Sequence, residues 1–487
     1  ECDAEIRDSG AKFYAATRLP DRCDQPAVYK TPMWKHQTVA YWFAYQRKGT
    51  LLAMLPGTGK SLVVVNLAEN TKAKRVLILC PVSVRGVWRR EFHKHAVSDF
   101  NMLVLEDGTT KRKAAKVNDH LTLCRVHGSP AVVVVNYESS WREELLAVLL
   151  RWEWDIVVAD ESHKIKSHNS NQSKAAAQIG RHAGRRLALS GSPLANGPLD
   201  IFGCARYVDP GVYGTSWHRF RSQFAISGPF GADQIVALKN LDELGQKMAL
   251  FTFQCGREVL DLPPETHQEI EFALSPSERR VQDEMAEDLI AFLDGGGEVT
   301  APNGLVKLLR LQQVTSGFVK DDDDELRNVG TSKIDTLTDL MESINEPVVV
   351  FAKFTETLNQ VRRMTEKLGR TYGEISGRRK DLTPHSTMPE SIDVMGVNHT
   401  AGGLGIDLTR VRIAIYLEHP WSCGDYGQSL ARVHRPGQDR PCMFYHLSAI
   451  DSVDGTVWKS LEKKADIIAS VLDQLRCVGN ELQSVSC

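Results

Sequence analysis

The stretch Leu55-Pro56-Gly57-Thr58-Gly59-Lys60-Ser61 follows the apolar run Thr50–Leu55 and precedes a helix-like segment, Leu62–Asn66. A glycine-rich turn between a strand and a helix lets backbone N–H groups converge on phosphate oxygens, because no Cβ blocks the approach. In such a turn the ammonium of Lys60 reaches the β- and γ-phosphates of a nucleotide, and the hydroxyl of Ser61 ligates Mg²⁺. The stretch therefore predicts an α/β fold with a phosphate-binding loop.

The glycine pattern of this loop is shorter than the strict phosphate-binding motif. That motif has a further glycine five residues before Gly59, where this chain has Met54. The match is therefore to a shorter variety of this motif. We still expect Gly57, Thr58 and Gly59 to bind ATP phosphates together with Lys60 and Ser61.

A pair of acids follows the second informative strand. Residues Asp155–Asp160 form an apolar run that ends in Asp160-Glu161, and the carboxyl edge of a parallel sheet is where α/β proteins bind ligands. Asp160 is suited to holding Mg²⁺, since hard cations prefer carboxylate oxygen. Glu161 is the candidate to orient the attacking water during hydrolysis.

Gln37 lies upstream in Met33-Trp34-Lys35-His36-Gln37. A side-chain amide offers both a donor and an acceptor to an adenine edge. We therefore predict that Gln37 contacts the nucleotide base.

Short β-branched runs alternate with helix-length stretches in two series, which predicts two α/β lobes with parallel sheets covered on both faces. The expected strands are Val76–Cys80, Ala131–Asn136, Asp155–Asp160 and Leu187–Ser190, then Val348–Phe351, Ile392–Val397, Ile413–Leu417 and Cys442–Leu447. Paired prolines in Asp261-Leu262-Pro263-Pro264 mark the boundary. We predict an N-terminal extension at 1–30, an ATP-binding lobe at 31–262 and a second lobe at 263–487.

Length and composition agree with this organisation. A chain of 487 residues exceeds the size at which one core usually stops growing, which favours two domains. No apolar run has the length that a bilayer requires, so we expect no membrane association. The ten cysteines are scattered without a C-x-x-C pair, which indicates free thiols in a reducing compartment rather than disulfides or zinc. The net charge of −2 gives no global sign of nucleic-acid binding.

The order of motifs resembles that of superfamily-two helicases and, within them, the Swi/Snf-type ATPases that translocate on double-stranded DNA. The resemblance covers about residues 31–475 and is closest to compact bacterial or viral members. Beyond the two nucleotide motifs, five segments carry it: Leu79–Val84 with Trp88 and Phe92, Leu187–Asn196, Val350–Phe354, Thr400–Thr409 and Gln428–Gln438.

The resemblance implies two tandem RecA-like lobes, each a parallel sheet flanked by helices, with ATP in the cleft between them. It also implies the roles of several residues. In the second lobe, Arg432 and Arg435 act on the transferring phosphoryl group, because an arginine fork is always charged and binds phosphate oxygens in two places. The other implied nucleotide contacts are Gly405 and Asp407, and the implied coupling residues are Ser190, Ser192 and Gln428.

The resemblance further implies that the chain tracks on the phosphate backbone of double-stranded DNA. The expected phosphate contacts are Ser83, Arg85, Lys353, Thr400, Gly402 and Gly403. We expect sequence-independent binding that weakens steeply with salt, because phosphate contacts release counterions. We expect a monomer inside the cell, in the cytoplasm of a bacterial or phage host or in a eukaryotic nucleus.

Two other functions stay open from the sequence. A strand-separating DNA or RNA helicase of the same superfamily would be stimulated by single strands rather than by duplex. A non-hydrolysing nucleic-acid scaffold is the alternative of a different class, although Lys60, Asp160, Glu161, Arg432 and Arg435 are all intact.

Overall fold

The computed structural model describes residues 23–106, 108–228, 235–256, 259–294, 301–320, 325–383, 386–399 and 406–483, with only the backbone for 287–294, 301–305, 307 and 473–483. The chain divides into two compact units, one of residues 1–260 with 466–487 and one of residues 261–465. The division at residue 261 lies at the paired prolines. The expected second lobe extends to residue 487, but residues from Asp466 on group with the first unit, and Val471 packs into a core of that unit.

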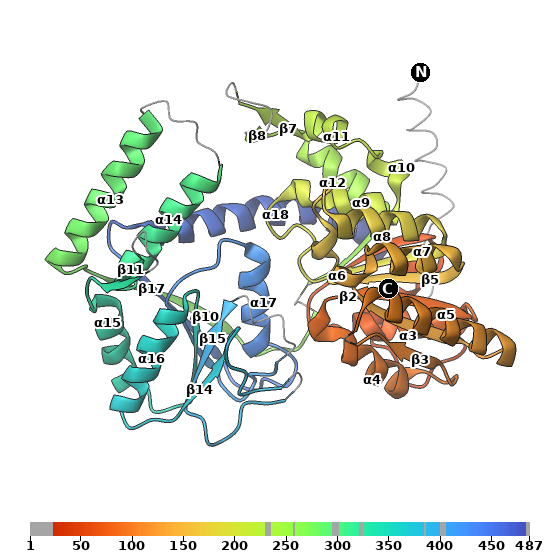
Figure 1. Ribbon diagram of the computed structural model, residues 1–487, viewed down its shortest axis with the longest axis horizontal. Coiled ribbons are helices and arrows are strands. Elements are labelled where there is room, and N and C mark those ends of the chain that lie inside the picture. Colours follow the sequence, from red (N-terminus) through yellow and green to blue (C-terminus); the bar gives the residue numbers. More distant parts are fainter. Residues whose placement is uncertain are drawn as a thin grey trace. The chain divides into compact units, whose positions relative to one another are not determined.

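The first unit contains a parallel sheet with helices on both faces (Figure 1). Its sheet strands are β1 (Gly49–Met54), β2 (Arg75–Cys80), β3 (Asn101–Val104), β4 (Ala131–Asn136), β5 (Trp154–Asp160), β6 (Ala183–Ser190) and β9 (Thr252–Cys255). Its helices are α2 (Lys35–Tyr45), α3 (Lys60–Asn70), α4 (Arg85–His95), α5 (Thr110–His127), α6 (Tyr137–Ser140), α7 (Glu143–Arg151), α8 (Asn171–Arg181), α9 (Ile201–Val208), α10 (Pro210–Tyr213), α11 (Trp217–Phe224) and α12 (Leu241–Ala249). Three 3₁₀ turns, η1 (Val82–Val84), η2 (Ser162–Ile165) and η3 (Pro198–Asp200), and a hairpin of β7 (Ala225–Ser227) and β8 (Ile235–Leu238) complete it.

The strands of this sheet lie in the order β3-β4-β2-β5-β6-β1-β9, and all neighbours are parallel. Alternate residues of each strand enter two separate cores, as the two-residue period of a strand requires. In β5, Val157 and Ala159 face the core that includes α5, α7, α8 and α9, whereas Ile156 and Val158 face the core that includes α2, α3 and α4. Burial on both faces explains why these strands read as continuous apolar runs.

The second unit contains another parallel sheet. Its sheet strands are β10 (Glu265–Phe272), β13 (Val348–Ala352), β14 (Tyr372–Ile375), β15 (Val394–Asn398), β16 (Ile413–Tyr416) and β17 (Cys442–Ala449). Its helices are α13 (Pro276–Asp294), α14 (Ala301–Thr315), α15 (Ser332–Glu342), α16 (Thr355–Lys367), α17 (Cys423–Val433) and the beginning of α18 (Val453–Gln483), and β11 (Phe318–Lys320) pairs with β12 (Leu326–Asn328).

The strand order in the second unit is β10-β17-β16-β13-β15-β14, again with parallel neighbours. Val348 and Val350 of β13 face one core, and Val349 and Phe351 face the other. Helix α16 lies beside β14 and β15, and α15 packs next to α16 (Figure 1). The expected fold class of two lobes with parallel sheets is therefore confirmed.

The chemistry of the described cysteines also agrees with the sequence. Those in the described part of the chain are free thiols: Cys23, Cys80, Cys124, Cys204, Cys255, Cys423 and Cys442. Among the described helices, none combines the length and the apolar character that crossing a membrane requires.

A column of stacked rings crosses the second unit. His419 Nε2 lies 2.9 Å from His446 Nδ1, and the ring of Trp458 stacks on His446 with a centroid distance of 4.4 Å. His399 stacks on Phe351, and its Nε2 lies 2.7 Å from the carbonyl oxygen of Glu418. Burial lowers the pKa of His399 to about 4 and, with the nearby His267, that of His446 to about 3.

We expect acid to destabilise the second unit through these histidines. A histidine whose folded pKa lies below its unfolded value near 6.5 stabilises the fold fully above that pH. This stability is lost as pH falls from about 6.5 towards the folded pKa, at about 1.4 kcal/mol per pH unit for one such residue. Urea unfolding between pH 7 and 4.5 measures the loss. In the variant His399→Gln this position cannot titrate. Its free energy of unfolding should therefore depend less steeply on pH, by about one proton fewer taken up on unfolding. An unchanged pH dependence would contradict the assignment.

Candidate functional site

The glycine-rich loop connects β1 to α3 as the sequence predicts. Gly57 and Gly59 have φ values of 87° and 86°, in the region that glycine adopts without steric cost. The hydroxyl of Thr58 donates to the carbonyl of Leu55 at 2.7 Å, and this bond closes the turn. The ammonium of Lys60, the first residue of α3, donates to the carbonyl of Met54 at 2.7 Å. The loop therefore has left-handed φ angles at both glycines, a helix N-terminus without a side-chain cap, and a lysine that reaches back over the loop. These features fit a bound triphosphate.

Gln37 packs directly against this loop. Its side chain is buried, and its Nε2 donates to the carbonyl of Thr58 at 2.9 Å. Its Oε1 accepts from the backbone N–H of Trp34 at 2.8 Å. A Cβ built on Gly59 would lie 2.2 Å from Gln37 Nε2, so only glycine allows this approach. Each end of the amide keeps the capacity for one further hydrogen bond, and its contact with a base stays a prediction.

The two acids lie at the carboxyl end of β5. Asp160 Oδ2 accepts from the indole N–H of Trp88 at 3.0 Å, and Asp160 Oδ1 accepts from the backbone N–H of Glu161 at 2.9 Å. Glu161 has a φ of 49°, which is uncommon for a residue with a side chain. The left-handed turn ends the strand abruptly and places both carboxyl groups at the same sheet edge as the glycine-rich loop.

The charge balance of this edge fits a divalent cation. Burial and the neighbouring Glu161 raise the pKa of Asp160, and the Lys60 ammonium opposes them only in part. Ser61 adds a hydroxyl oxygen, and Mg²⁺ prefers carboxylate and hydroxyl oxygens of this kind. Among the described residues no cluster of three or more His, Cys, Asp or Glu forms a metal site of the protein alone. This agrees with Mg²⁺ sites that combine one or two protein ligands with substrate phosphates.

The residues of the first unit that are expected to couple hydrolysis to movement lie at the next strand end. Ser190 is fully buried at the carboxyl end of β6, and its Oγ accepts from the backbone N–H of Ser192 at 3.1 Å. A Cβ on Gly191 would lie 2.8 Å from the ring of Pro56, so this turn packs closely on the glycine-rich loop. The structure therefore brings Ser190 and Ser192 to the same edge as Lys60 and Asp160.

The expected residues of the second unit are described in part. Gln428 and Arg432 lie on α17, which begins after a side-chain cap by Ser422. Arg435 follows this helix and points its Nη1 at the carbonyl of Ile406 at 3.5 Å. Asp407 Oδ1 accepts from the backbone N–H of Thr409 at 2.9 Å. Gly405 lies outside the described residues.

The expected phosphate contacts of DNA are also only partly described. Thr400, Gly402 and Gly403 lie outside the described residues. Ser83 is in η1, and the guanidinium of Arg85 donates to the carbonyl of Leu105 at 2.6 Å. Lys353 donates to Gln312 Oε1 at 2.9 Å and lies 4.4 Å from the ring centroid of Trp421. Burial lowers the pKa of Lys353 to about 8, against the effect of Glu418. A role of these side chains in phosphate binding stays a prediction.

Sequence reasoning missed four residues around the nucleotide motifs. His36 Nε2 lies 3.0 Å from the carbonyl of Thr58, and Tyr137 donates to the carbonyl of Asp160 at 2.7 Å. The third and fourth are Trp88 and Glu91 on α4; burial raises the pKa of Glu91, and the neighbouring Lys94 and Ser61 oppose this rise in part. From the sequence, Trp88 is identified only within a segment that carries the family resemblance, because contacts of this kind depend on tertiary structure.

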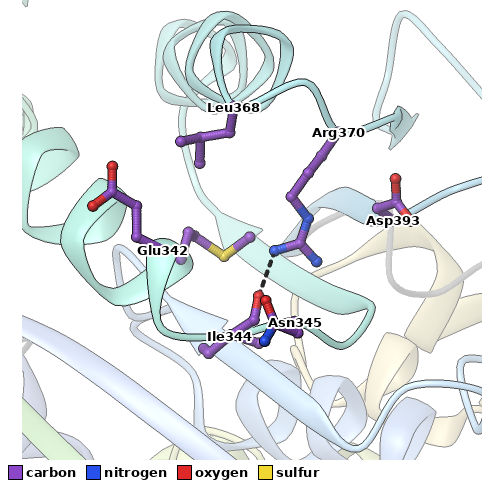
Figure 2. Close-up of a pocket in the computed structure, with 7 residues that line it drawn as sticks. Glu342, Ile344, Asn345, Leu368, Arg370 and Asp393 are labelled. Atoms are coloured by element: carbon purple, nitrogen blue, oxygen red, sulfur yellow. Dashed lines mark hydrogen bonds between the residues drawn. The ribbon is translucent and has the colours of Figure 1, made fainter.

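A pocket of about 450 Å³ lies on the second unit (Figure 2). Its lining includes Glu342, Arg370 and Asp393, and Arg370 Nη1 donates to the carbonyl of Ile344 at 2.9 Å. Arg370 and Asp393 precede β14 and β15, so the pocket is at the amino edge of the sheet. Ligands of parallel sheets bind at the opposite, carboxyl edge.

Several proteins are similar to this chain. "DNA repair and recombination protein RDH54" from Saccharomyces cerevisiae (strain AWRI1631) is 25% identical over 427 residues, which cover 78% of this chain and 44% of the relative. "Putative ATP-dependent helicase/translocase YwqA" from Bacillus subtilis is 23% identical over 97% of this chain and 51% of the relative. The chain spans about half the length of the curated relatives it matches. Among solved structures, a "Sulfolobus solfataricus SWI2/SNF2 ATPase core in complex with dsDNA" aligns with a TM-score of 0.43 and 20% identity over 96% of this chain and 99% of that chain.

Family models cover most of both units. The model described as the SNF2-related domain matches residues 34–317, more than half of the chain, and the model described as the helicase conserved C-terminal domain matches residues 332–437. The resemblance stated from the sequence motifs is thereby confirmed, as is the expectation of two RecA-like lobes. This chain belongs to the SNF2-related family of helicase-like ATPases.

Proposed function

We propose that this chain is an ATP-dependent motor that moves along double-stranded DNA by holding its phosphate backbone. The observation that carries the proposal is the meeting of Lys60, Asp160 and Glu161 at one sheet edge, each at the end of a buried parallel strand or in the turn after it. Membership of the SNF2-related family supports it, as do relatives described as a helicase/translocase and as a DNA repair protein.

In the proposed nucleotide site, the N–H groups of Gly57, Thr58 and Gly59 bind phosphate oxygens. When a nucleotide binds, the Lys60 ammonium leaves its hydrogen bond with the carbonyl of Met54 and binds the β- and γ-phosphates instead. The flexible lysine side chain allows this change of partner. Ser61 and Asp160 hold Mg²⁺, which neutralises charge on the phosphates. Gln37, already against the loop, uses its remaining donor and acceptor for the adenine edge.

Glu161 orients the attacking water and takes its proton in this mechanism. Its carboxylate lies 3.2 Å from His163 Nδ1, so its position is limited from the protein side. The neighbouring Asp160, held by two N–H donors, is assigned to the metal, and Glu161 is the acid proposed to act on the water. In this proposal Asp160 binds the metal, and the adjacent Glu161 acts as the general base.

The second lobe supplies Arg432 and Arg435 to the transferring phosphoryl group. We propose that Gly405 and Asp407 complete the nucleotide contacts and that Ser190, Ser192 and Gln428 couple hydrolysis to movement. Under this proposal hydrolysis requires residues of both lobes, because the arginines belong to a different lobe from Lys60.

The proposed DNA contacts are Ser83, Arg85, Lys353, Thr400, Gly402 and Gly403, all directed at phosphates. Phosphate contacts position a protein on a duplex and carry no sequence information, so movement is independent of sequence. The chain acts as a monomer inside the cell under this proposal. The salt dependence of binding should be steep for the same reason.

A triplex-displacement assay tests the proposal. A duplex carries a short third strand in its major groove, and a motor that tracks on the duplex removes the third strand without separating the other two. We expect ATP-dependent release of the third strand by the wild-type chain and none by Lys60→Ala. Separation of the duplex itself would move the conclusion to a strand-separating helicase. Absence of release, with no ATP hydrolysis, would favour the non-hydrolysing scaffold.

A further inference from the structure

Helix α4 reaches the carboxyl group on which the proposed metal site depends. Trp88 is 1% exposed, and its indole N–H donates to Asp160 Oδ2 at 3.0 Å. The other oxygen, Asp160 Oδ1, accepts from the backbone N–H of Glu161. One oxygen of Asp160 is therefore fixed by its own turn, and the other is fixed by a separate helix.

The same helix begins at the segment proposed to hold DNA. Turn η1 contains Ser83, and α4 starts at Arg85, three residues before Trp88. Three residues of α-helix rise about 4.5 Å, so one helical turn separates the proposed phosphate contact from the indole. The guanidinium of Arg85 donates to the carbonyls of Leu105 and Val82, which orders the start of this turn.

The face of α4 that carries Trp88 and Phe92 is embedded in a packed core. Trp88 and Phe92 lie 6.4 Å apart between ring centroids, and Phe92 packs edge-on against Phe100 at 5.1 Å. Trp88 and Phe92 belong to the core that also contains α3, whose first residues carry the phosphate-binding lysine and serine. A packed helix moves as a unit, because close packing transmits a displacement instead of absorbing it.

Helix α4 also comes near the other proposed metal ligand. Glu91 lies three residues after Trp88, on the same side of the helix, and burial raises the pKa of its carboxyl group while the neighbouring Ser61 opposes that rise in part. Glu91 Oε2 is also 3.9 Å from His95 Nε2, one turn further along. Helix α4 therefore contacts Asp160 through Trp88 and carries Glu91 close to Ser61.

We propose that Trp88 is a positioning residue for the Mg²⁺ site and that a duplex held at the start of α4 acts on that site through it. The inference rests on the proposed function and adds the route by which DNA regulates the nucleotide site. Each oxygen of Asp160 can accept one more partner beside its N–H donor. Because the Trp88 indole N–H occupies one lone pair of Asp160 Oδ2, it determines from which side that oxygen can accept the metal.

The test uses the full chain with Trp88→Phe, which keeps an aromatic ring and removes the N–H donor. The measurement is the Mg²⁺ concentration at half-saturation for binding of a fluorescent ADP analogue, with and without duplex DNA. Loss of a partner that orients a metal ligand weakens metal affinity by about 10–100-fold. We expect that increase in the Mg²⁺ requirement, with ADP binding in EDTA unchanged. We also expect duplex DNA to lower the requirement in the wild type and to have little effect in the variant.

Trp154→Phe is the matched control. Trp154 is also buried in the first unit, and its indole N–H donates to the carbonyl of Leu149 at 2.8 Å. It starts β5, at the strand end opposite Asp160, roughly 20 Å away by strand geometry. The control should keep both the wild-type Mg²⁺ requirement and the effect of duplex DNA. If Trp88→Phe does not fold, a tryptophan analogue with sulfur in place of the indole N–H keeps the volume and removes the same donor.

The outcomes separate this inference from the proposed function. A wild-type Mg²⁺ requirement in Trp88→Phe overturns the positioning role while the proposed function stands. A raised requirement with an undiminished effect of duplex DNA overturns the route through α4. A wild-type chain that binds no nucleotide with Mg²⁺ overturns the proposed function and the inference with it.

Discussion

Glu161→Gln is expected to lower the rate of ATP hydrolysis by about 10²–10⁴-fold, the contribution of a positioned general base. The amide has nearly the shape of the carboxylate, but it cannot take a proton from the attacking water. Nucleotide binding should persist, because Lys60 and Asp160 keep their places at the sheet edge. Steady-state hydrolysis in the presence of duplex DNA, with ADP affinity measured in parallel, checks both parts.

Glu138→Gln provides the control for this prediction. Glu138 follows the carboxyl end of β4, is exposed, and accepts from Asn136 Nδ2 at 2.9 Å. It is an acid at the same sheet edge that has no role in the proposed chemistry, so its variant should hydrolyse ATP at nearly the wild-type rate. Equal losses in the two variants, or a loss below tenfold in Glu161→Gln, would contradict the assignment of the base.

Arg435→Lys is expected to lower the hydrolysis rate by about 10³–10⁵-fold, the effect of an arginine that stabilises the transferring phosphoryl group. Lysine keeps the charge but loses the planar fork that binds two phosphate oxygens at once. The bond from Arg435 to the carbonyl of Ile406 is long at 3.5 Å, so leaving it costs little. Single-turnover hydrolysis measures the chemical step separately from binding.

Arg440→Lys is the matched control in the same lobe. Arg440 is 45% exposed, pairs with Glu346 at 3.3 Å and donates to the carbonyl of Arg410 at 2.7 Å, so the substitution changes surface contacts that have no role in the proposed chemistry. Its hydrolysis rate should stay within about twofold of the wild type. If Arg435→Lys retained the wild-type rate in single turnover, Arg435 would have no part in phosphoryl transfer.

The buried parallel strands could be predicted from the sequence because burial on both faces demands continuous apolar runs. Strand β4 has the expected bounds, Ala131–Asn136, and β16 differs from the expected Ile413–Leu417 by one residue. Strand β10, in contrast, has the sequence Glu-Thr-His-Gln-Glu-Ile-Glu-Phe and is mostly exposed at a sheet edge. An edge strand of this composition has no apolar pattern to read, so only its pairing with β17 identifies it.

The nucleotide motifs were predictable for a different reason. They are local: a strand end, a turn and a helix start are consecutive in the chain, so Gly57 to Ser61 and Asp160-Glu161 can be read from spacing alone. The bonds from Trp88 to Asp160 and from Tyr137 to the carbonyl of Asp160 join residues that are 72 and 23 positions apart. Spacing says nothing about such contacts, because they exist only after the sheet has formed.

The second unit shows the same limit. From the sequence we predict that Lys353 contacts phosphate. In the structure its ammonium donates a hydrogen bond to Gln312, and its backbone N–H donates to the buried Glu418. Glu418 also accepts from Ser316 and Thr357, so three donors meet at one carboxylate. A single acid after an apolar strand gives no sign of that network in the sequence.

The most direct measurement of the central claim is ATP hydrolysis at low salt with no nucleic acid, single-stranded DNA, duplex DNA or RNA in parallel. A motor that holds the backbone of a duplex should hydrolyse ATP strongly only with duplex DNA, and added salt should remove the stimulation as phosphate contacts weaken. Stronger stimulation by single strands or by RNA, or no hydrolysis under any of the four conditions, would contradict the claim.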